Sequence, residues 1–195
     1  MIQCALTGGI GTGKSLVCKI FSILGAVVFN ADEAAKSLYT KPELISRISE
    51  TFGSDCVKEG KVNLKALADK VFNDHEALEK LNQIIHPLVM EEYQQWLAQQ
   101  APHAICIMES AIIFEAGLHD RFDRIICVYA PEQVCIDRII QRDGVTQEKV
   151  RLRLNAQMNP DIKVKKSHHV IINDDQQLVI PQVIDVYSQL IAARQ

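Results

Sequence analysis

Residues 8–15 read Gly8-Gly9-Ile10-Gly11-Thr12-Gly13-Lys14-Ser15 and fill every required position of the Walker A pattern G-x-x-x-x-G-K-[ST]. A short apolar run, Ile2 to Leu6, precedes this stretch and predicts a strand. Glycines at these positions let the backbone turn so tightly that successive N–H groups point at the β-phosphate of a nucleotide, and the positive end of the next helix adds to the attraction. A glycine-rich turn that matches by accident is the alternative, and the flanking strand and helix patterns argue against it. The sequence therefore predicts a phosphate cradle.

The side chains of the motif predict how the cradle acts. Lys14 would reach the β- and γ-phosphates, and the Ser15 hydroxyl would hold Mg²⁺ directly. The residues expected to bind the nucleotide are Gly9, Gly11, Thr12, Gly13, Lys14, Ser15 and Leu16.

The composition is that of an ordinary globular protein with one sizeable core. The chain has 195 residues, of which 48% are hydrophobic and 23% are charged. Its net charge of -3 argues against nucleic acid as the main partner, because phosphate backbones are usually met by a basic excess. The longest apolar runs have strand length and no secretory signal precedes the first strand, so we expect no membrane span and a cytoplasmic location. The six cysteines show no C-x-x-C pair, which predicts reduced core thiols.

Apolar runs alternate with helix-period stretches, which is typical of βαβ units around a parallel sheet. The strand candidates are Ile2 to Leu6, Ala26 to Phe29, Ala104 to Met108, Arg124 to Tyr129 and His169 to Ile172. We therefore expect an α/β fold with a five-stranded parallel sheet flanked by helices.

A block of about seventy residues separates the second and third strand candidates and reads almost wholly as helix. The predicted helices are residues 31–39, 42–52, 64–72 and 76–100. Pro87 falls inside the last of them, where it must kink the helix or begin a new one. The block is too long for a simple crossover. Because ligands gather beyond the carboxyl ends of parallel strands, we expect this insert to hold a second substrate in line with the γ-phosphate, as a kinase requires.

Asp32 is the carboxylate best placed to meet that second substrate. It comes three residues after Phe29, at the carboxyl end of the second strand candidate. A carboxylate there can orient an attacking hydroxyl or accept its proton late in a loose transition state. Capping of the following helix is the alternative role. The nearby cradle favours the catalytic one.

Arginines gather on a helical hairpin after the fourth strand candidate. Arg138 and Arg142 are four residues apart on one helix, so they share a face. The turn signal Asp143-Gly144 follows, and a second helix carries Arg151 and Arg153. The hairpin resembles a lid that would close over the nucleotide and place guanidinium groups on the transferring phosphoryl. A solvated helix face with ordinary salt bridges is the alternative.

Three further positions carry weaker signals. Glu109 ends the apolar run of the third strand candidate and could act on Mg²⁺ through water, in the manner of a Walker B carboxylate. His86, just before Pro87, is either an acceptor contact or a packing histidine. His168-His169 lacks a further partner at metal-ligand spacing, so we do not expect metal binding there.

Several segments together match one family. They are Ala5 to Ser15, Asn30-Ala31-Asp32, Phe52-Gly53, Leu67 to Phe72, Leu81 to Val89 with its His86-Pro87 pair, Gln141-Arg142-Asp143, Arg153 to Met158, Lys163 and Asn173. In this set the chain resembles the dephospho-CoA kinases nearly from end to end. Three positions depart from the family pattern. Asn30 and His168 each replace a usual Asp, and Glu109 to Glu115 stands where the family tends to have Asp, an apolar residue, Pro and Leu-Leu-Phe-Glu.

The resemblance implies one P-loop kinase domain over residues 1–195. Within it, residues 1–30, 101–135 and 167–195 would form the nucleotide core, residues 31–100 the acceptor-binding insert and residues 136–166 the lid. It also implies ATP- and Mg²⁺-dependent phosphorylation of the ribose 3′-hydroxyl of dephospho-CoA, the last step of coenzyme A synthesis. The catalytic residues would be Asp32 as base, Lys14 and Arg142, and the substrate-binding residues Asp32, His86, Pro87 and Arg138.

Two other functions stay open from the residues alone. A nucleoside monophosphate kinase would share the cradle and the lid but would recognise another acceptor, and the His86-Pro87 segment favours the CoA precursor. A regulatory GTPase would need guanine selectivity, and its Asn-Lys-x-Asp signature is absent from the sequence. Nothing in the sequence identifies a protein partner.

Overall fold

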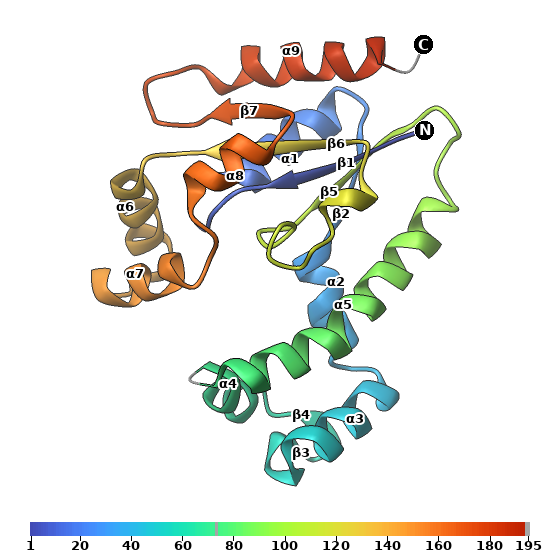
Figure 1. Cartoon of the computed structure of the whole chain (residues 1–195), viewed down its shortest axis with the longest axis vertical. Helices are drawn as coiled ribbons and strands as arrows, with labels where there is room; N and C mark the ends of the chain where they lie inside the picture. Colours follow the sequence, from blue (N-terminus) through green and yellow to red (C-terminus); the bar gives the residue numbers. More distant parts are fainter. Residues whose placement is uncertain (73, 194–195) are drawn as a thin grey trace. The chain divides into compact units, whose positions relative to one another are not determined.

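A five-stranded parallel sheet is the framework of the protein (Figure 1). The computed structural model describes residues 1–72 and 74–193. The strands are β1 (Ile2–Thr7), β2 (Val27–Asn30), β5 (Ile105–Glu109), β6 (Arg124–Tyr129) and β7 (His169–Ile172), in the spatial order β2-β5-β1-β6-β7. All four pairings are parallel, so the carboxyl ends of the strands meet at one edge. The five predicted strands are confirmed, with bounds that differ by no more than one residue.

The chain divides into two compact units, residues 1–30 with 99–195 and residues 31–98. The first unit holds the sheet. Its helices are α1 (Lys14–Ile23), η2 (His119–Arg121), α6 (Glu132–Asp143), α7 (Gln147–Asn155), α8 (Pro160–Lys166) and α9 (Val179–Ala192).

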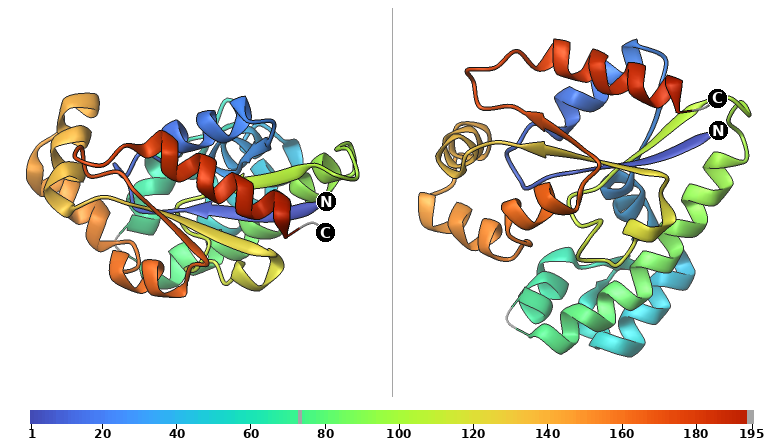
Figure 2. Two further views of the ribbon diagram at one scale, coloured as in Figure 1. Left: turned by 90° about the horizontal axis from the view of Figure 1, so that it is seen from above. Right: turned by 45° about the horizontal axis from the view of Figure 1, so that its top comes forward.

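The core of the first unit forms because its central strands are apolar on both faces, as in other parallel sheets. Every residue of β5 is buried, and α1 packs beside α9 on one face of the sheet (Figure 2). Leu6, Phe21, Ile126 and Leu190 meet there with no exposed surface. Burying each such side chain contributes about 1.5–3 kcal/mol. This packing covers one face of the sheet with an apolar layer.

The second unit is mainly helical. Its elements are α2 (Ala31–Leu38), α3 (Pro42–Phe52), η1 (Ser54–Cys56), β3 (Val57–Lys58), β4 (Lys61–Val62), α4 (Leu64–Phe72) and α5 (His75–Leu97). Helices α2 and α4 both pack against α5.

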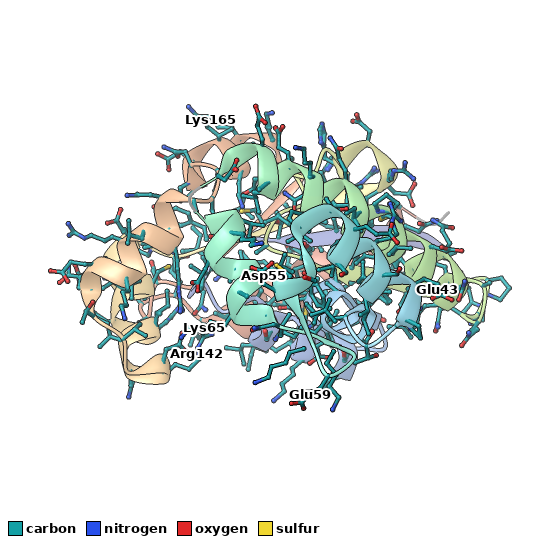
Figure 3. The ribbon with its side chains drawn as sticks, turned by 90° about the horizontal axis from the view of Figure 1, so that it is seen from below. Glu43, Asp55, Glu59, Lys65, Arg142 and Lys165 are labelled. Carbon is teal, nitrogen blue, oxygen red and sulfur yellow. The ribbon has the colours of Figure 1, made fainter. Side chains whose placement is uncertain are left out.

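The predicted helices leave residues 57–62 unassigned, and there β3 and β4 form an antiparallel hairpin that the sequence analysis did not predict. Glu59 and Gly60 turn the chain with φ angles of 53° and 73°, and Glu59 projects from the tip (Figure 3). Each strand has only two residues, which is too short for an alternating pattern to show in the sequence.

Helix α5 continues through Pro87, so of the two expectations, a kinked helix or a new one, the new helix is wrong. Proline lacks the N–H of a helical hydrogen bond, and in a helix interior it costs about 3 kcal/mol. Ile84 and Ile85 before it, and Val89 and Met90 after it, are all buried. Their packing offsets the missing bond and keeps one helix.

All six cysteine side chains are buried and free, as predicted. In the described part of the chain, no helix combines the length and the apolar character needed to cross a membrane.

Candidate active site

The cradle connects the end of β1 to the start of α1 at Lys14, and its backbone shape requires glycine. Gly8 has a φ of 149°, and a Cβ atom there would lie 2.3 Å from the Val128 carbonyl oxygen. Gly13 has a φ of 90°, and a Cβ atom there would lie 2.2 Å from Asn173 Nδ2. Neither position has room for a side chain. The loop therefore has the tight turn and close neighbours that a phosphate cradle needs.

Residues from α6 and from the segment after the edge strand β7 hold the backbone of the cradle. Asn173 follows β7 and is 7% exposed, and its Nδ2 donates to the Thr12 carbonyl oxygen at 2.8 Å. Arg138 of α6 donates to the Gly11 carbonyl oxygen at 3.3 Å and to Asn173 Oδ1 at 3.2 Å. It also pairs with Asp175. Arg138, predicted to bind substrate, thus contacts the cradle backbone itself.

Lys14 and Ser15 lie at the first turn of α1, as the motif predicts. Lys14 Nζ donates to the carbonyl oxygens of Gly8 and Gly9 at 3.1 Å each. The Ser15 hydroxyl donates to Glu109 Oε1 at 2.9 Å. The Lys14 ammonium thus lies against the loop, and the Ser15 hydroxyl lies at the carboxyl end of β5.

Glu109 lies at that end of β5, 7% exposed. The β-ladder pairs Leu6 and Asn30 with it on either side. Its second oxygen, Oε2, accepts from Asn30 Nδ2 at 3.3 Å. Two of the departures from the family pattern therefore contact each other. Burial, and then the charge and hydrogen bond of Glu109, raise the pKa of the Cys18 thiol far above its ordinary value, which keeps that thiol protonated.

The Ser15 hydroxyl and the Glu109 carboxylate are a suitable donor set for Mg²⁺. This ion prefers oxygen ligands and usually keeps several waters besides one or two protein groups. A carboxylate and a hydroxyl 2.9 Å apart fit that preference. Elsewhere among the described residues, no group of three or more His, Cys, Asp or Glu side chains could hold a metal.

His168, the third departure, has a structural contact. The imidazole Nδ1 accepts from the Ile125 backbone N–H at 3.0 Å, and the backbone N–H of His168 donates to the Ile125 carbonyl oxygen at 2.9 Å. Both bonds join the start of β7 to β6, so the imidazole serves as an acceptor at the sheet edge.

The arginine hairpin is present as helices α6 and α7, whose apolar faces pack together through Ile136, Ile139 and Val150. At its tip, Arg142 binds both oxygens of Asp143, at 2.7 and 3.1 Å. Arg153 NH1 donates to Asp143 Oδ2 at 3.0 Å. The hydrogen bond from Arg142 is the main cause that lowers the pKa of the Asp143 carboxyl.

The tip is open to solvent. The side chain of Arg142 is 62% exposed and that of Arg153 is 45% exposed. Figure 3 shows Arg142 at the carboxyl end of α6. The two arginines share one carboxylate, and a phosphate could replace it because both groups offer pairs of anionic oxygens that accept bidentate hydrogen bonds from a guanidinium.

The candidate residues of the second unit are less constrained. Helix α2 begins at Ala31, so exposed Asp32 lies inside its first turn and not at the N-cap position. The capping alternative for Asp32 is therefore wrong. His86 is half-buried, and burial lowers the pKa of its imidazole, so this side chain is neutral at pH 7. Pro87 is exposed on α5.

A buried ion pair lies between α8 and the loop after β5. Lys163 is 1% exposed, and its Nζ lies 2.7 Å from Glu115 Oε1 and 2.7 Å from the Ala111 carbonyl oxygen. The same Glu115 oxygen accepts from the Met158 N–H at 2.9 Å. Sequence patterns did not predict these contacts, because a lysine on a short polar helix reads as a surface residue.

The comparisons with known proteins give one answer. The family model described as dephospho-CoA kinase matches residues 2–178. The dephospho-CoA kinase of Bacteroides fragilis is 34% identical over 190 residues, covering 97% of this chain and 93% of the relative. That of Aquifex aeolicus is 36% identical over 193 residues, covering 97% and 98%. The chain belongs to the dephospho-CoA kinase family.

Solved structures agree with this membership. A dephospho-CoA kinase from Campylobacter jejuni has a TM-score of 0.69 at 26% identity, with 99% of this chain and 98% of that chain covered. A Thermus thermophilus protein has a TM-score of 0.85 at 27% identity, with 100% and 98% covered. A shikimate kinase from Bacteroides thetaiotaomicron, 11% identical with a TM-score of 0.55 and coverage of 98% and 97%, shares the fold alone. The predicted P-loop kinase fold is confirmed.

Proposed function

We propose that this protein transfers the γ-phosphoryl of ATP to the ribose 3′-hydroxyl of dephospho-CoA, giving coenzyme A and ADP. The observation that carries the proposal is the cradle, in which Gly8 and Gly13 leave no room for a side chain, together with Lys14 and the Ser15–Glu109 pair, in a chain of the dephospho-CoA kinase family. The reaction is the last step of coenzyme A synthesis. A cytoplasmic location stays a prediction from the sequence.

The nucleotide half of the reaction rests on positioning and charge. Backbone N–H groups at Gly9, Gly11, Thr12 and Gly13, together with those of Lys14, Ser15 and Leu16 at the start of α1, would bind the phosphates. Lys14 would exchange its contacts with the carbonyl oxygens of Gly8 and Gly9 for phosphate oxygens. Mg²⁺ supplies charge neutralisation at the β- and γ-oxygens when it is bound. Ser15 would hold it directly, and Glu109 through water.

The acceptor half is assigned to residues 31–100, with Asp32 as the base. Asp32 is exposed and follows β2 by two residues, and the last residue of β2, Asn30, is hydrogen-bonded to Glu109. A carboxylate at this chain position can take the hydroxyl proton without a raised pKa, because the transition state of phosphoryl transfer is loose. His86 and Pro87 of α5 are proposed as acceptor contacts.

Residues 136–166 are proposed as the lid. Its Arg142 would exchange Asp143 for the transferring phosphoryl, and guanidinium groups stabilise the charge that spreads over the phosphoryl oxygens. Arg138 would add a contact to the bound substrate from its place on the cradle.

The acceptor decides between this proposal and a nucleoside monophosphate kinase. The protein is incubated with ATP and Mg²⁺ and with dephospho-CoA, AMP or adenosine. Mass spectrometry identifies the product, and phosphorus NMR locates the new phosphate. We expect dephospho-CoA to be phosphorylated on the ribose 3′-hydroxyl, and AMP and adenosine to be poor acceptors because they lack the remote binding energy of the pantetheine arm. Faster conversion of AMP to ADP would overturn the proposal.

A further inference from the structure

The segment that joins α7 to α8 is anchored to two other parts of the first unit. Gln157 Oε1 accepts from the backbone N–H of Ile10, in the cradle, at 2.9 Å. The next residue, Met158, donates its N–H to Glu115 Oε1 at 2.9 Å. Two successive residues are thus tied to two different loops at the carboxyl edge of the sheet.

In the hydrogen bond between Ile10 and Gln157, Ile10 is the donor and Gln157 is the acceptor. A backbone N–H can only donate, so the atom of the Gln157 carboxamide that faces it must be the oxygen. The partners are 147 positions apart in the chain, and Gln157 is partly buried. The bond is therefore a tertiary contact that fixes the orientation of the carboxamide.

The Glu115 carboxylate that binds the Met158 N–H is itself held by a buried ion pair. Glu115 is held by Lys163, whose side chain is 1% exposed. Separating a buried ammonium from its carboxylate leaves an uncompensated charge, which costs several kcal/mol. Met158 is therefore fixed, and Gln157 beside it has a fixed backbone from which to reach the cradle.

Two adjacent residues of the cradle are held by side chains from the first helix of the hairpin and from the segment after the second. Arg138 of α6 donates to the Gly11 carbonyl oxygen at 3.3 Å, while Gln157 beyond α7 accepts from Ile10 at 2.9 Å. A cavity of about 320 Å³ lies beside this point, lined in part by Gly9, Thr12 and Asn159. Glycine-rich backbone has many accessible conformations, so fixing Ile10 and Gly11 lowers the number that the loop can adopt.

We infer that Gln157 is a positioning residue for nucleotide binding. By accepting the Ile10 hydrogen bond it holds the cradle in the shape in which the following N–H groups converge on a phosphate. It acts through Ile10 and needs no contact with the ligand. The inference rests on the nucleotide-binding part of the proposed function and not on the identity of the acceptor.

Three variants test the inference. Gln157→Met keeps the length of the side chain and removes the strong acceptor. Gln157→Glu keeps an acceptor for the Ile10 N–H. Gln147→Met makes the first change at an exposed residue at the start of α7 and serves as the matched control. The measurements are hydrogen exchange of the Ile10 amide by NMR without nucleotide, ADP affinity by calorimetry, and Tm.

We expect the Ile10 amide to exchange at least about fivefold faster in Gln157→Met, since one hydrogen bond is worth about 1 kcal/mol. ADP affinity should fall by about the same factor, and Tm should fall by no more than about 2–4 °C, the effect of losing one hydrogen bond. In Gln157→Glu the Ile10 amide should keep its protection, and Gln147→Met should match the wild type in every measurement.

Two results would overturn the inference. One is equal Ile10 exchange in wild type and Gln157→Met. The other is ADP binding in Gln157→Met that is unchanged or tighter, which would mean that the carboxamide is dispensable or competes with the phosphate. Neither measurement uses an acceptor substrate, so failure of dephospho-CoA as the acceptor would leave this test intact.

Discussion

The candidate site residues of the two compact units are held in different ways. In the first unit, Lys14, Ser15 and Glu109 each make hydrogen bonds to other parts of the site. In the second unit, Asp32 is exposed and His86 is half-buried, and neither side chain has a hydrogen bond or ion pair among the described residues. On the proposed function, we expect the phosphate cradle to be organised before any ligand binds, and the proposed acceptor side to depend on the substrate for its final order.

The largest effect is expected for Lys14→Ala, which tests the organised side. Loss of this cation should lower kcat by roughly 10³- to 10⁵-fold, the range for cations that stabilise a transferring phosphoryl. The fold should be intact, because the side chain is bonded to the loop and not to the core. A coupled kinase assay and circular dichroism measure the two properties. Lys19→Ala, at an exposed position of the same helix, is the control. Near-normal activity of a folded Lys14→Ala protein would remove the basis for the cradle assignment.

Asp32→Asn tests the less ordered side. The change keeps the size of the side chain and removes the charge, so kcat should fall by roughly 10²- to 10⁴-fold if Asp32 is the base. Tm should be nearly the same, because Asp32 is exposed and caps no helix. Steady-state kinetics with dephospho-CoA, with Asp69→Asn on α4 as the control, provide the measurement. Normal turnover would exclude Asp32 as the base.

Glu115→Gln tests how much the buried Lys163–Glu115 ion pair contributes to the stability of the first unit. Lys163 would be left buried and unpaired, and we expect a loss of about 3 kcal/mol, the lower end of the range because Glu115 is 23% exposed. For a chain of this size Tm should fall by roughly 6–12 °C. Calorimetry measures it. The double variant Glu115→Leu with Lys163→Met should recover much of the loss, since an apolar pair can replace a buried ion pair. If Tm falls as far in the double variant as in Glu115→Gln, the loss of stability does not come from the unpaired charge of Lys163.

Arg142→Lys tests the exposed tip of the hairpin. Lysine keeps one positive charge but loses the planar fork, so kcat should fall by about 10- to 100-fold. The affinity for ATP should weaken less, because the contact is proposed to form in the transition state. An effect confined to the KM for ATP would show that Arg142 only binds the nucleotide.

The smallest effect concerns His86 and the pH dependence of stability. Burial lowers the folded-state pKa of this imidazole below 6.5, so the unfolded chain takes up the proton first as the pH falls. Its contribution to stability is therefore complete above about pH 6.5 and is lost as the pH falls from there through the folded pKa. His86→Gln should weaken the decline in unfolding free energy between about pH 7.5 and about pH 5.5. Urea unfolding across that range measures it, and an unchanged decline would contradict the burial effect.

Local patterns predicted the sheet, the cradle and the arginine hairpin, because each depends on residues close together in the chain. The supports of the cradle were not predicted. Asn173 reaches Thr12 across 161 positions and Gln157 reaches Ile10 across 147. Gln157, Lys163 and Asn173 lie at positions that match the family pattern, and Glu115 ends a segment compared with it. That match did not give their contacts, because an amide or an ion pair is identified by its partner and not by its neighbours in sequence.

The strand order also has a consequence for synthesis of the chain on the ribosome. β1 is the central strand and the first to emerge, yet its partners β5 and β6 begin only at residues 105 and 124. At about 5–20 residues per second, β1 waits roughly 5–20 s for a neighbour. During that interval the apolar side chains of β1 and α1 lack the neighbouring strands that bury them in the folded protein, so they are exposed to solvent until β5 and β6 are synthesised.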